Sequence, residues 1–172
     1  MRELDDTKEQ LNLINHWESL IRDANASLDL CNSNFELELI EESQLGLDLL
    51  REELDRWEFQ RLLSGEYDKE YAIVTINAGA GGTDAQDWVE ILLRMYSRWS
   101  ENHSMKCVIN EISEGEEAGI KSVTFEVQGK YAYGYLQNEK GTHRLVRISP
   151  FNANGKRQTS FAGVEVMPKL DD

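Results

Sequence analysis

The sequence predicts an α+β fold in two parts: an acidic helical hairpin or small bundle over residues 1–68, followed by an α+β domain over residues 69–172. Apolar residues recur at helical spacing through the first part, and segments rich in β-branched residues begin at residue 71. The balance of charged residues also changes. Residues 1–69 contain 7 Lys/Arg and 18 Asp/Glu, whereas residues 70–172 contain 11 Lys/Arg and 14 Asp/Glu. The net charge of −14 argues against a general nucleic-acid coat protein.

The first part is expected to be helical almost throughout residues 1–64. Two stretches of helical apolar periodicity occur, and the second, over residues 35–63, contains no proline. We expect the sequence DANAS at 23–27 to break the first helix and Gly65 to end the second. We interpret the many acidic residues as the solvated outer face of a helical hairpin.

The second part is expected to follow the order β-α-β-β-α-β, an antiparallel α+β arrangement of the split-βαβ kind. The helix is amphipathic, and its predicted apolar face consists of Trp88, Ile91, Leu92, Met95, Tyr96 and Trp99. The expected elements are a strand over 71–79, a helix over 83–102, strands over 106–113 and 120–129, an ambiguous segment over 131–141 and a last strand over 159–168.

A glycine-rich turn, GAGGTDAQ, joins the first strand to this helix. Such turns can hold a phosphate at a helix N-terminus, but Asp84 and Asp87 would repel one and no phosphate-loop lysine follows. Thr83 and Gln86 fit a capping box, in which their side chains bond the free amides of the helix end. The alternative is a helix tip that presents backbone amides and one carboxylate to a neutral group such as a base edge.

Residues 140–164 form a basic island in an acidic chain. Phe151 offers a stacking surface there, and Ser149 is one of several short polar side chains that fit base edges. One interpretation is a contact with single-stranded nucleic acid; the other is an ordinary loop in which Pro150 fixes a turn and Phe151 packs into the core. The island contains no acid and five cations: Lys140, Arg144, Arg147, Lys156 and Arg157.

No catalytic or metal-binding set stands out elsewhere. His143 has no partner that would complete a nucleophilic triad, and the acidic sequence SEGEE at 113–117 lacks the spacing of a calcium loop. Cys31 and Cys107 are too few for a disulfide framework or a zinc site. We therefore expect no cofactor and no metal.

Neither a membrane span nor a targeting signal is predicted. The sequence has no run of 18 apolar residues, so no membrane partner is expected. Its first ten residues, MRELDDTKEQ, are acidic, unlike a secretory signal or a transit peptide. If the protein acts in an organelle, its targeting segment is expected to lie outside this sequence.

Several long strings resemble the class I peptide chain release factors, and specifically those of the release factor 2 type. They are AGAGGTDAQDWVEILLRMYSRW, GEEAGIKSVTFEVQGKYAYGY, GTHRLVRISPF and RQTSF. The resemblance runs from about residue 73 to 168, and the acidic helical part resembles the first domain of the family. The strings GTDAQDW and NGKRQTSFAGVEVMP look more like the chloroplast branch than the bacterial one.

The resemblance implies translation termination, with recognition of the stop codons UGA and UAA in mRNA at the decoding centre of the ribosome. The Ser-Pro-Phe tripeptide of the family contacts the codon, together with the helix tip and the stretch after the tripeptide. The flanking cations would meet RNA phosphates. The implied codon-binding residues are Ser149, Pro150, Phe151, Gly81, Gly82, Thr83, Asp84, Arg157, Gln158 and Thr159, and the implied phosphate-binding residues are Arg144, Arg147 and Lys156.

Three departures from the family pattern bear on function. The usual Glu at the helix tip is Asp84, and a His that stacks on the codon in the bacterial pattern is Gln158. Loss of that stacking would weaken the free energy of codon binding by about 1–3 kcal/mol. The catalytic Gly-Gly-Gln tripeptide is absent from these 172 residues, so no catalytic residue is assigned, and the chain is not expected to be an enzyme by itself.

Two functions therefore remain open, beside a third alternative, a ribosome-associated or decaying fragment with no specific ligand. The first is a stop-codon recognition module acting in a bacterial-type cytoplasm or in the chloroplast stroma. The second is an organellar protein, derived from a release factor, that binds single-stranded RNA and stabilises transcripts. Retention of Ser149, Pro150 and Phe151 favours the first, whereas the missing Gly-Gly-Gln and Gln158 favour the second.

Overall fold

The computed structural model describes residues 2–33 and 37–170, and the chain divides into two compact units: unit 1, Met1–Leu62, and unit 2, Leu63–Asp172. This division precedes the boundary expected after residue 68. The segment after Leu62 is held within unit 2 through Asp68. Its carboxylate accepts a hydrogen bond from Gln137 Nε2 at 2.9 Å, and its carbonyl accepts one from the Gly134 amide at 3.1 Å.

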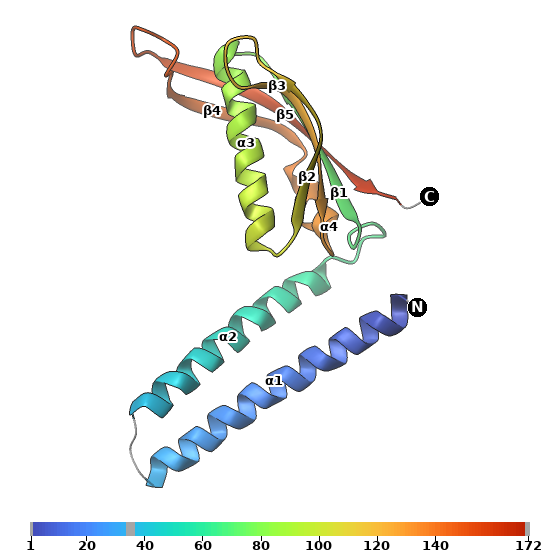
Figure 1. Ribbon diagram of the computed structural model, residues 1–172, viewed down its shortest axis with the longest axis vertical. Coiled ribbons are helices and arrows are strands. Elements are labelled where there is room, and N and C mark those ends of the chain that lie inside the picture. Colours follow the sequence, from blue (N-terminus) through green and yellow to red (C-terminus); the bar gives the residue numbers. More distant parts are fainter. Residues whose placement is uncertain (1, 34–36, 171–172) are drawn as a thin grey trace. The chain divides into compact units, whose positions relative to one another are not determined.

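Unit 1 is a pair of long antiparallel helices, α1 (Arg2–Ser33) and α2 (Leu37–Leu62) (Figure 1). The expected break at 23–27 was wrong, because α1 continues through it. That segment contains neither Gly nor Pro, Ala24 is buried, and the Ser27 hydroxyl donates to the Asp23 carbonyl one turn earlier. The start of the second expected helix, residues 35–36, lies outside the described residues.

Aromatic contacts join the two helices of unit 1. The rings of Trp17 and Trp57 meet edge to face, with their centroids 5.7 Å apart, and the Trp17 indole donates a 2.8 Å hydrogen bond to Glu53. Trp17 and Leu50 are among the few buried side chains of this unit.

In the described part of the chain, neither of these helices nor any other has the length and apolar character needed to cross a bilayer.

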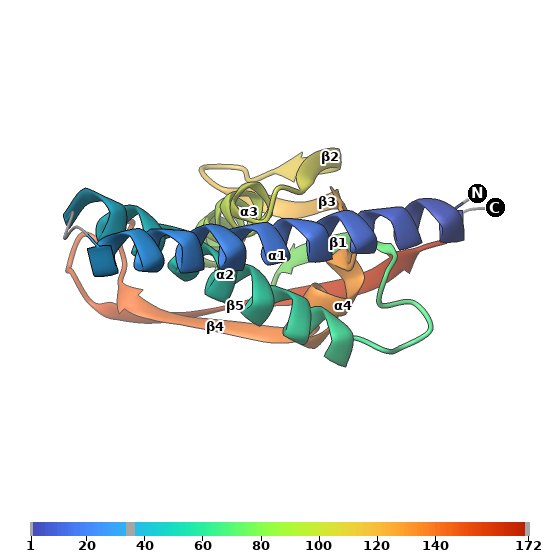
Figure 2. The same cartoon turned by 90° about the horizontal axis from the view of Figure 1, so that it is seen from below.

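Unit 2 contains a five-stranded, fully antiparallel sheet in the order β2-β3-β1-β5-β4, and Figure 2 shows the strands in this succession. Strands β1 and β2 flank β3 and are joined by α3, so the predicted split-βαβ arrangement and α+β class are confirmed. The elements are β1 (Tyr71–Ala78), α3 (Thr83–Asn102), β2 (Lys106–Glu114), β3 (Ile120–Gln128), α4 (Ala132–Leu136), η1 (Gln137–Glu139), β4 (Gly141–Ile148) and β5 (Arg157–Lys169).

Two elements differ from the prediction. The ambiguous segment over 131–141 forms α4 and the short 3-10 helix η1, and strand β4 follows where no strand was expected. Strand β4 lies at the edge of the sheet, and none of its residues is buried. Its two arginines interrupt the alternation that would have revealed a strand. The basic island, residues 140–164, therefore comprises β4, the loop that follows it and the first part of β5, and is not an isolated loop.

The core of unit 2 lies between α3 and one face of the sheet (Figure 1). Phe125, Ile76 and Leu92 are fully buried there, and Tyr96 packs against Phe125 with ring centroids 6.2 Å apart. Of the predicted apolar face of α3, Leu92 and Tyr96 are buried, but Met95 is 45% exposed. Ala85 and Val89 are also buried, so the buried face is shifted relative to the predicted one.

The substitution Phe125→Ala is expected to lower the free energy of unfolding of unit 2 by about 3–5 kcal/mol, because it leaves a cavity in the centre of this core. Urea unfolding followed through the amide resonances of unit 2 measures the difference. Met167→Ala on the exposed side of β5 is the control, with an expected change within about 0.5 kcal/mol. Equal losses for both substitutions would contradict this assignment of the core.

Candidate nucleic-acid interface

Three segments meet at one end of unit 2: the N-terminal end of α3, the β2–β3 turn and the β4–β5 loop (Figure 1). Side-chain hydrogen bonds connect them. The Thr83 hydroxyl at the helix tip donates to Glu117 of the β2–β3 turn at 3.2 Å. The Ser149 hydroxyl of the β4–β5 loop donates to Asp84 at 2.7 Å. Residues distant in sequence thus form one continuous surface, which we call the tip surface.

The glycine turn is fixed against β5 by its backbone. The Gly79 amide donates to the Phe161 carbonyl at 2.8 Å, and the Phe161 amide donates to the Ala80 carbonyl at 3.1 Å. Gly81 has φ +138°, and a Cβ there would lie 3.1 Å from the Ser160 hydroxyl and 3.2 Å from the Ala85 methyl. The turn therefore requires glycine at position 81 both for backbone conformation and for space.

The capping-box prediction was wrong. The N-cap residue of α3 is Gly82, with φ +59°, and no side chain caps the helix. Thr83 is consequently the first residue inside the helix, where its hydroxyl reaches Glu117 instead of an amide of the first turn. The arrangement agrees with the alternative prediction, a helix tip whose backbone amides are not satisfied by side-chain caps.

Ser149 is the buried anchor of the β4–β5 loop. Its side chain is 3% exposed, donates to Asp84, and accepts a 3.1 Å hydrogen bond from the Phe151 amide. The Ser149 amide donates to the Lys156 carbonyl at 3.2 Å, which closes the loop. Because one hydroxyl bonds both the helix and the loop backbone, it fixes the position of the residues that follow it.

The rest of the loop is exposed. Phe151 is 45% exposed, so the interpretation in which its ring packs into the core was wrong. Asn152 shapes the turn, since its side-chain oxygen accepts from the Asn154 amide at 2.9 Å and its carbonyl accepts from the Gly155 amide at 3.0 Å. Exposed residues also include Pro150, Lys156, Arg157 and Thr159, with Gln158 half-buried.

The cations of the basic island have different environments. Arg144 is exposed, whereas Arg147 is half-buried and forms an ion pair with Asp87 of α3. The Arg147 Nε and Asp84 Oδ1 atoms are buried without a hydrogen-bond partner among the described residues. Arg147, expected to contact phosphate, thus lies against α3. From the sequence, Asp87 was assigned only an electrostatic role at the N-terminus of the helix, and its pairing with Arg147 was missed. The spacing of Asp84 and Asp87, about one helical turn, does indicate that the two carboxylates share a face.

His143 has a structural environment. Its Nε2 atom lies 2.9 Å from the Glu139 carbonyl, and its own carbonyl accepts a hydrogen bond from the Trp88 indole at 3.2 Å. Within residues 2–33 and 37–170, no three His, Cys, Asp or Glu side chains are grouped so as to hold a metal ion. The tip surface offers hydrogen-bond donors, carboxylates, one aromatic ring and exposed cations, a combination suited to unpaired bases and their phosphates.

The family model described as the PCRF domain matches residues 1–164, a range that includes the whole tip surface. The chain belongs to the peptide chain release factor family.

Within that family, the similarity is to proteins of the release factor 2 type. The chain is 52% identical to peptide chain release factor PrfB1, chloroplastic, of Arabidopsis thaliana over 98% of this chain and 38% of that protein. It is 48% identical to peptide chain release factor 2 of Clostridium perfringens, over 95% of this chain and 44% of that protein. The structure of RF2 of Thermus thermophilus superposes with a TM-score of 0.67 at 39% identity, covering 99% of this chain and 47% of that one. The chain therefore spans less than half the length of these relatives.

The ion pair between Arg147 and Asp87 is expected to stabilise the docking of β4 on α3. In a double-mutant cycle of Arg147→Gln and Asp87→Asn, we expect a coupling energy of about 1–3 kcal/mol, because both side chains are largely removed from water. Urea unfolding of the four proteins measures it. Arg144→Gln, at an exposed position of the same strand, should combine additively with Asp87→Asn. If the effects of Arg147→Gln and Asp87→Asn on the free energy of unfolding are also additive, the ion pair contributes nothing to stability.

Proposed function

We propose that this chain recognises the stop codons UGA and UAA in the ribosomal decoding centre, as part of a translation termination factor of the release factor 2 type. The observation that carries the proposal is the 2.7 Å hydrogen bond from Ser149 to Asp84. It joins the Ser-Pro-Phe tripeptide to the helix tip, so the segments that the family resemblance assigns to the codon occupy one surface.

The chemistry of the tip surface fits an unpaired codon. The exposed Phe151 ring offers a face on which a base can stack. Such stacking contributes about 1–3 kcal/mol to the free energy of binding. The uncapped amides at Gly82 and Thr83 can donate to base-edge oxygens. Lys156 and Arg157 are exposed beside the loop and can meet phosphates. Gly81 lets the backbone turn close against β5. Thr159 is exposed in β5, near the loop.

The environment of Arg147 suggests a different role from phosphate binding. Its guanidinium is paired with Asp87, and strand β4 leads directly from it to Ser149. We assign Arg147 the role of positioning the loop. Phosphate contact is left to exposed cations, namely Arg144, Lys156 and Arg157.

The two departures from the family pattern affect affinity more than codon choice. Asp84 is one methylene shorter than the usual glutamate, yet it still reaches the Ser149 hydroxyl. Gln158 is half-buried and lies opposite Arg147 in the strand register. An amide in place of an imidazole keeps hydrogen bonding but loses an aromatic face, so weaker binding to the same codons follows.

Peptide release is not proposed for these 172 residues, because they contain no Gly-Gly-Gln. The second candidate is an organellar protein that binds single-stranded RNA and stabilises transcripts, and Gln158 in place of the codon-stacking His favours it. The similarity to a chloroplast protein and to bacterial ones supports action in the chloroplast stroma or in a bacterial-type cytoplasm.

Binding to ribosomes programmed with UGA, UAA, UAG or a sense codon in the decoding site tests the proposal. We expect tighter binding with UGA and UAA. Phe151→Ala should weaken binding at UGA by roughly fivefold to a hundredfold, in line with the loss of one stacked base, and should change binding at the sense codon much less.

The matched control is Lys156→Ala, which removes a charge from the same loop. It should lower affinity about equally for every codon and reduce the salt dependence of binding. Equal weakening by Phe151→Ala at UGA and at the sense codon would exclude a codon role for the ring. Binding to free single-stranded RNA with no codon preference on the ribosome would favour the transcript-binding function.

A further inference from the structure

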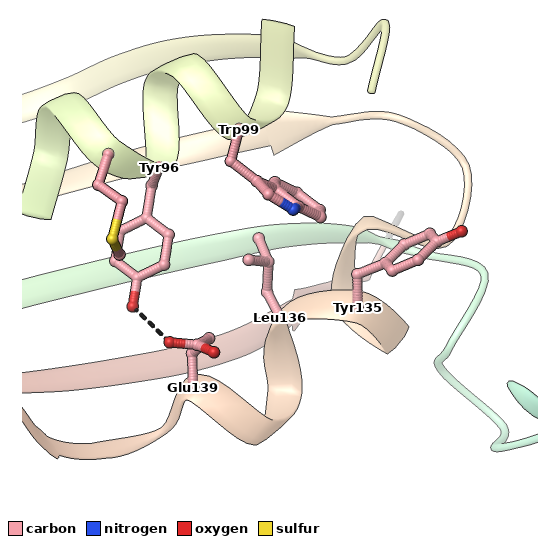
Figure 3. Close-up of a pocket in the computed structure, with 6 residues that line it drawn as sticks. Tyr96, Trp99, Tyr135, Leu136 and Glu139 are labelled. Atoms are coloured by element: carbon pink, nitrogen blue, oxygen red, sulfur yellow. Dashed lines mark hydrogen bonds between the residues drawn. The ribbon is translucent and has the colours of Figure 1, made fainter. Parts of the chain in front are cut away.

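A groove opens between the C-terminal half of α3 and the α4–η1 segment (Figure 3). Its volume is about 380 Å³. It lies near the end of α3 opposite the glycine turn, and none of the residues of the tip surface lines it. The lining residues are Met95, Tyr96, Trp99, Tyr135, Leu136 and Glu139.

The walls of the groove are mainly aromatic. Trp99 and Tyr135 meet edge to face, with ring centroids 5.7 Å apart and planes inclined by 64°. His103 stacks on Trp99 at 4.2 Å, which holds the indole ring in place. Met95, 45% exposed, lies at the same groove. The aromatic faces are therefore fixed by packing within unit 2 and remain partly open to solvent.

A single carboxylate, that of Glu139, interrupts this apolar lining. Its Oε2 atom accepts a 2.9 Å hydrogen bond from the Tyr96 hydroxyl (Figure 3), and its side chain is 42% exposed. Burial, then the hydrogen bond to Glu139 and the charge of that carboxylate, raise the pKa of Tyr96, so the phenol stays protonated as a donor. The His143 Nε2 atom lies 3.8 Å from the same Oε2 atom. A carboxylate can accept about four hydrogen bonds, so Glu139 has capacity for a further donor.

We propose that this groove binds an arginine side chain presented by a partner protein. A guanidinium has flat, weakly hydrated faces that stack on Trp and Tyr, and donors at its edge that match a carboxylate. The chain already contains the first of these contacts, since Arg61 lies over the Trp57 ring of unit 1 at 5.0 Å. The groove supplies both the aromatic faces and the carboxylate in one place.

Other occupants fit less well. A purely apolar side chain would cover Glu139 and remove its charge from water without compensation. RNA phosphate would be repelled by the same carboxylate, in a chain of net charge −14. A lysine ammonium is more strongly hydrated and has no flat face to lie against the rings, so arginine is favoured over lysine.

Binding of capped tripeptides to the full chain tests the proposal. The probes are acetyl-Gly-Arg-Gly-amide and its lysine, norleucine and glutamate counterparts, and the readout is the indole N–H resonance of Trp99, identified by its loss in Trp99→Phe. We expect saturable shifts with the arginine peptide, smaller shifts with lysine, and the weakest response with norleucine and glutamate. Glu139→Gln, whose amide oxygen can still accept from Tyr96, should weaken arginine binding by about threefold to tenfold.

The control is Glu90→Gln, which makes the same charge change at an exposed position of α3 and should leave arginine binding unaltered. Tyr135→Ala should also weaken binding, and the spectrum of each variant shows whether unit 2 is folded. Equal binding of the norleucine or lysine peptide, or equal weakening by Glu90→Gln, would overturn the proposal. Because these peptides are tested without ribosomes, the outcome is independent of codon recognition.

Discussion

The hydrogen bond from the Ser149 hydroxyl to the Asp84 carboxylate is the contact on which the tip surface depends. It joins residues 65 positions apart in sequence, one in a hairpin loop and one in the first turn of a helix. Both partners are held by backbone elsewhere: α3 begins at a glycine turn bonded to β5, and the loop is closed between Ser149 and Lys156. The arrangement of the tip surface therefore depends on how firmly α3 is packed on the sheet.

This dependence explains why so many small and polar residues occur together in the chain. Gly81 permits a backbone turn that a Cβ would obstruct, and the buried Ser160 lies directly beneath it. Asp87 and Arg147 add a second contact between the same helix and the same hairpin. The residues that the sequence assigned to the site thus divide into two groups: those that support the surface, such as Ser149, and those that are exposed on it, such as Phe151.

Much of this organisation was predictable from the sequence. The amphipathic pattern of α3 and the β-branched runs of β1 and β3 follow from local rules, and they gave the α+β class and the split-βαβ order. Strand β4 was missed because its arginines and lack of buried residues conceal the alternation. The capping box failed because a positive φ at Gly82 moves the helix start, and the partner of Arg147 lies 60 positions away. Such pairings depend on tertiary contacts that no local pattern contains.

The position of β4 at the edge of the sheet has a consequence for self-association. An edge strand exposes unpaired backbone groups that can add a strand from another molecule, and charged side chains are a common defence against such pairing. Arg144 is exposed on this edge. Its charge therefore disfavours the pairing of β4 with a strand of a second molecule.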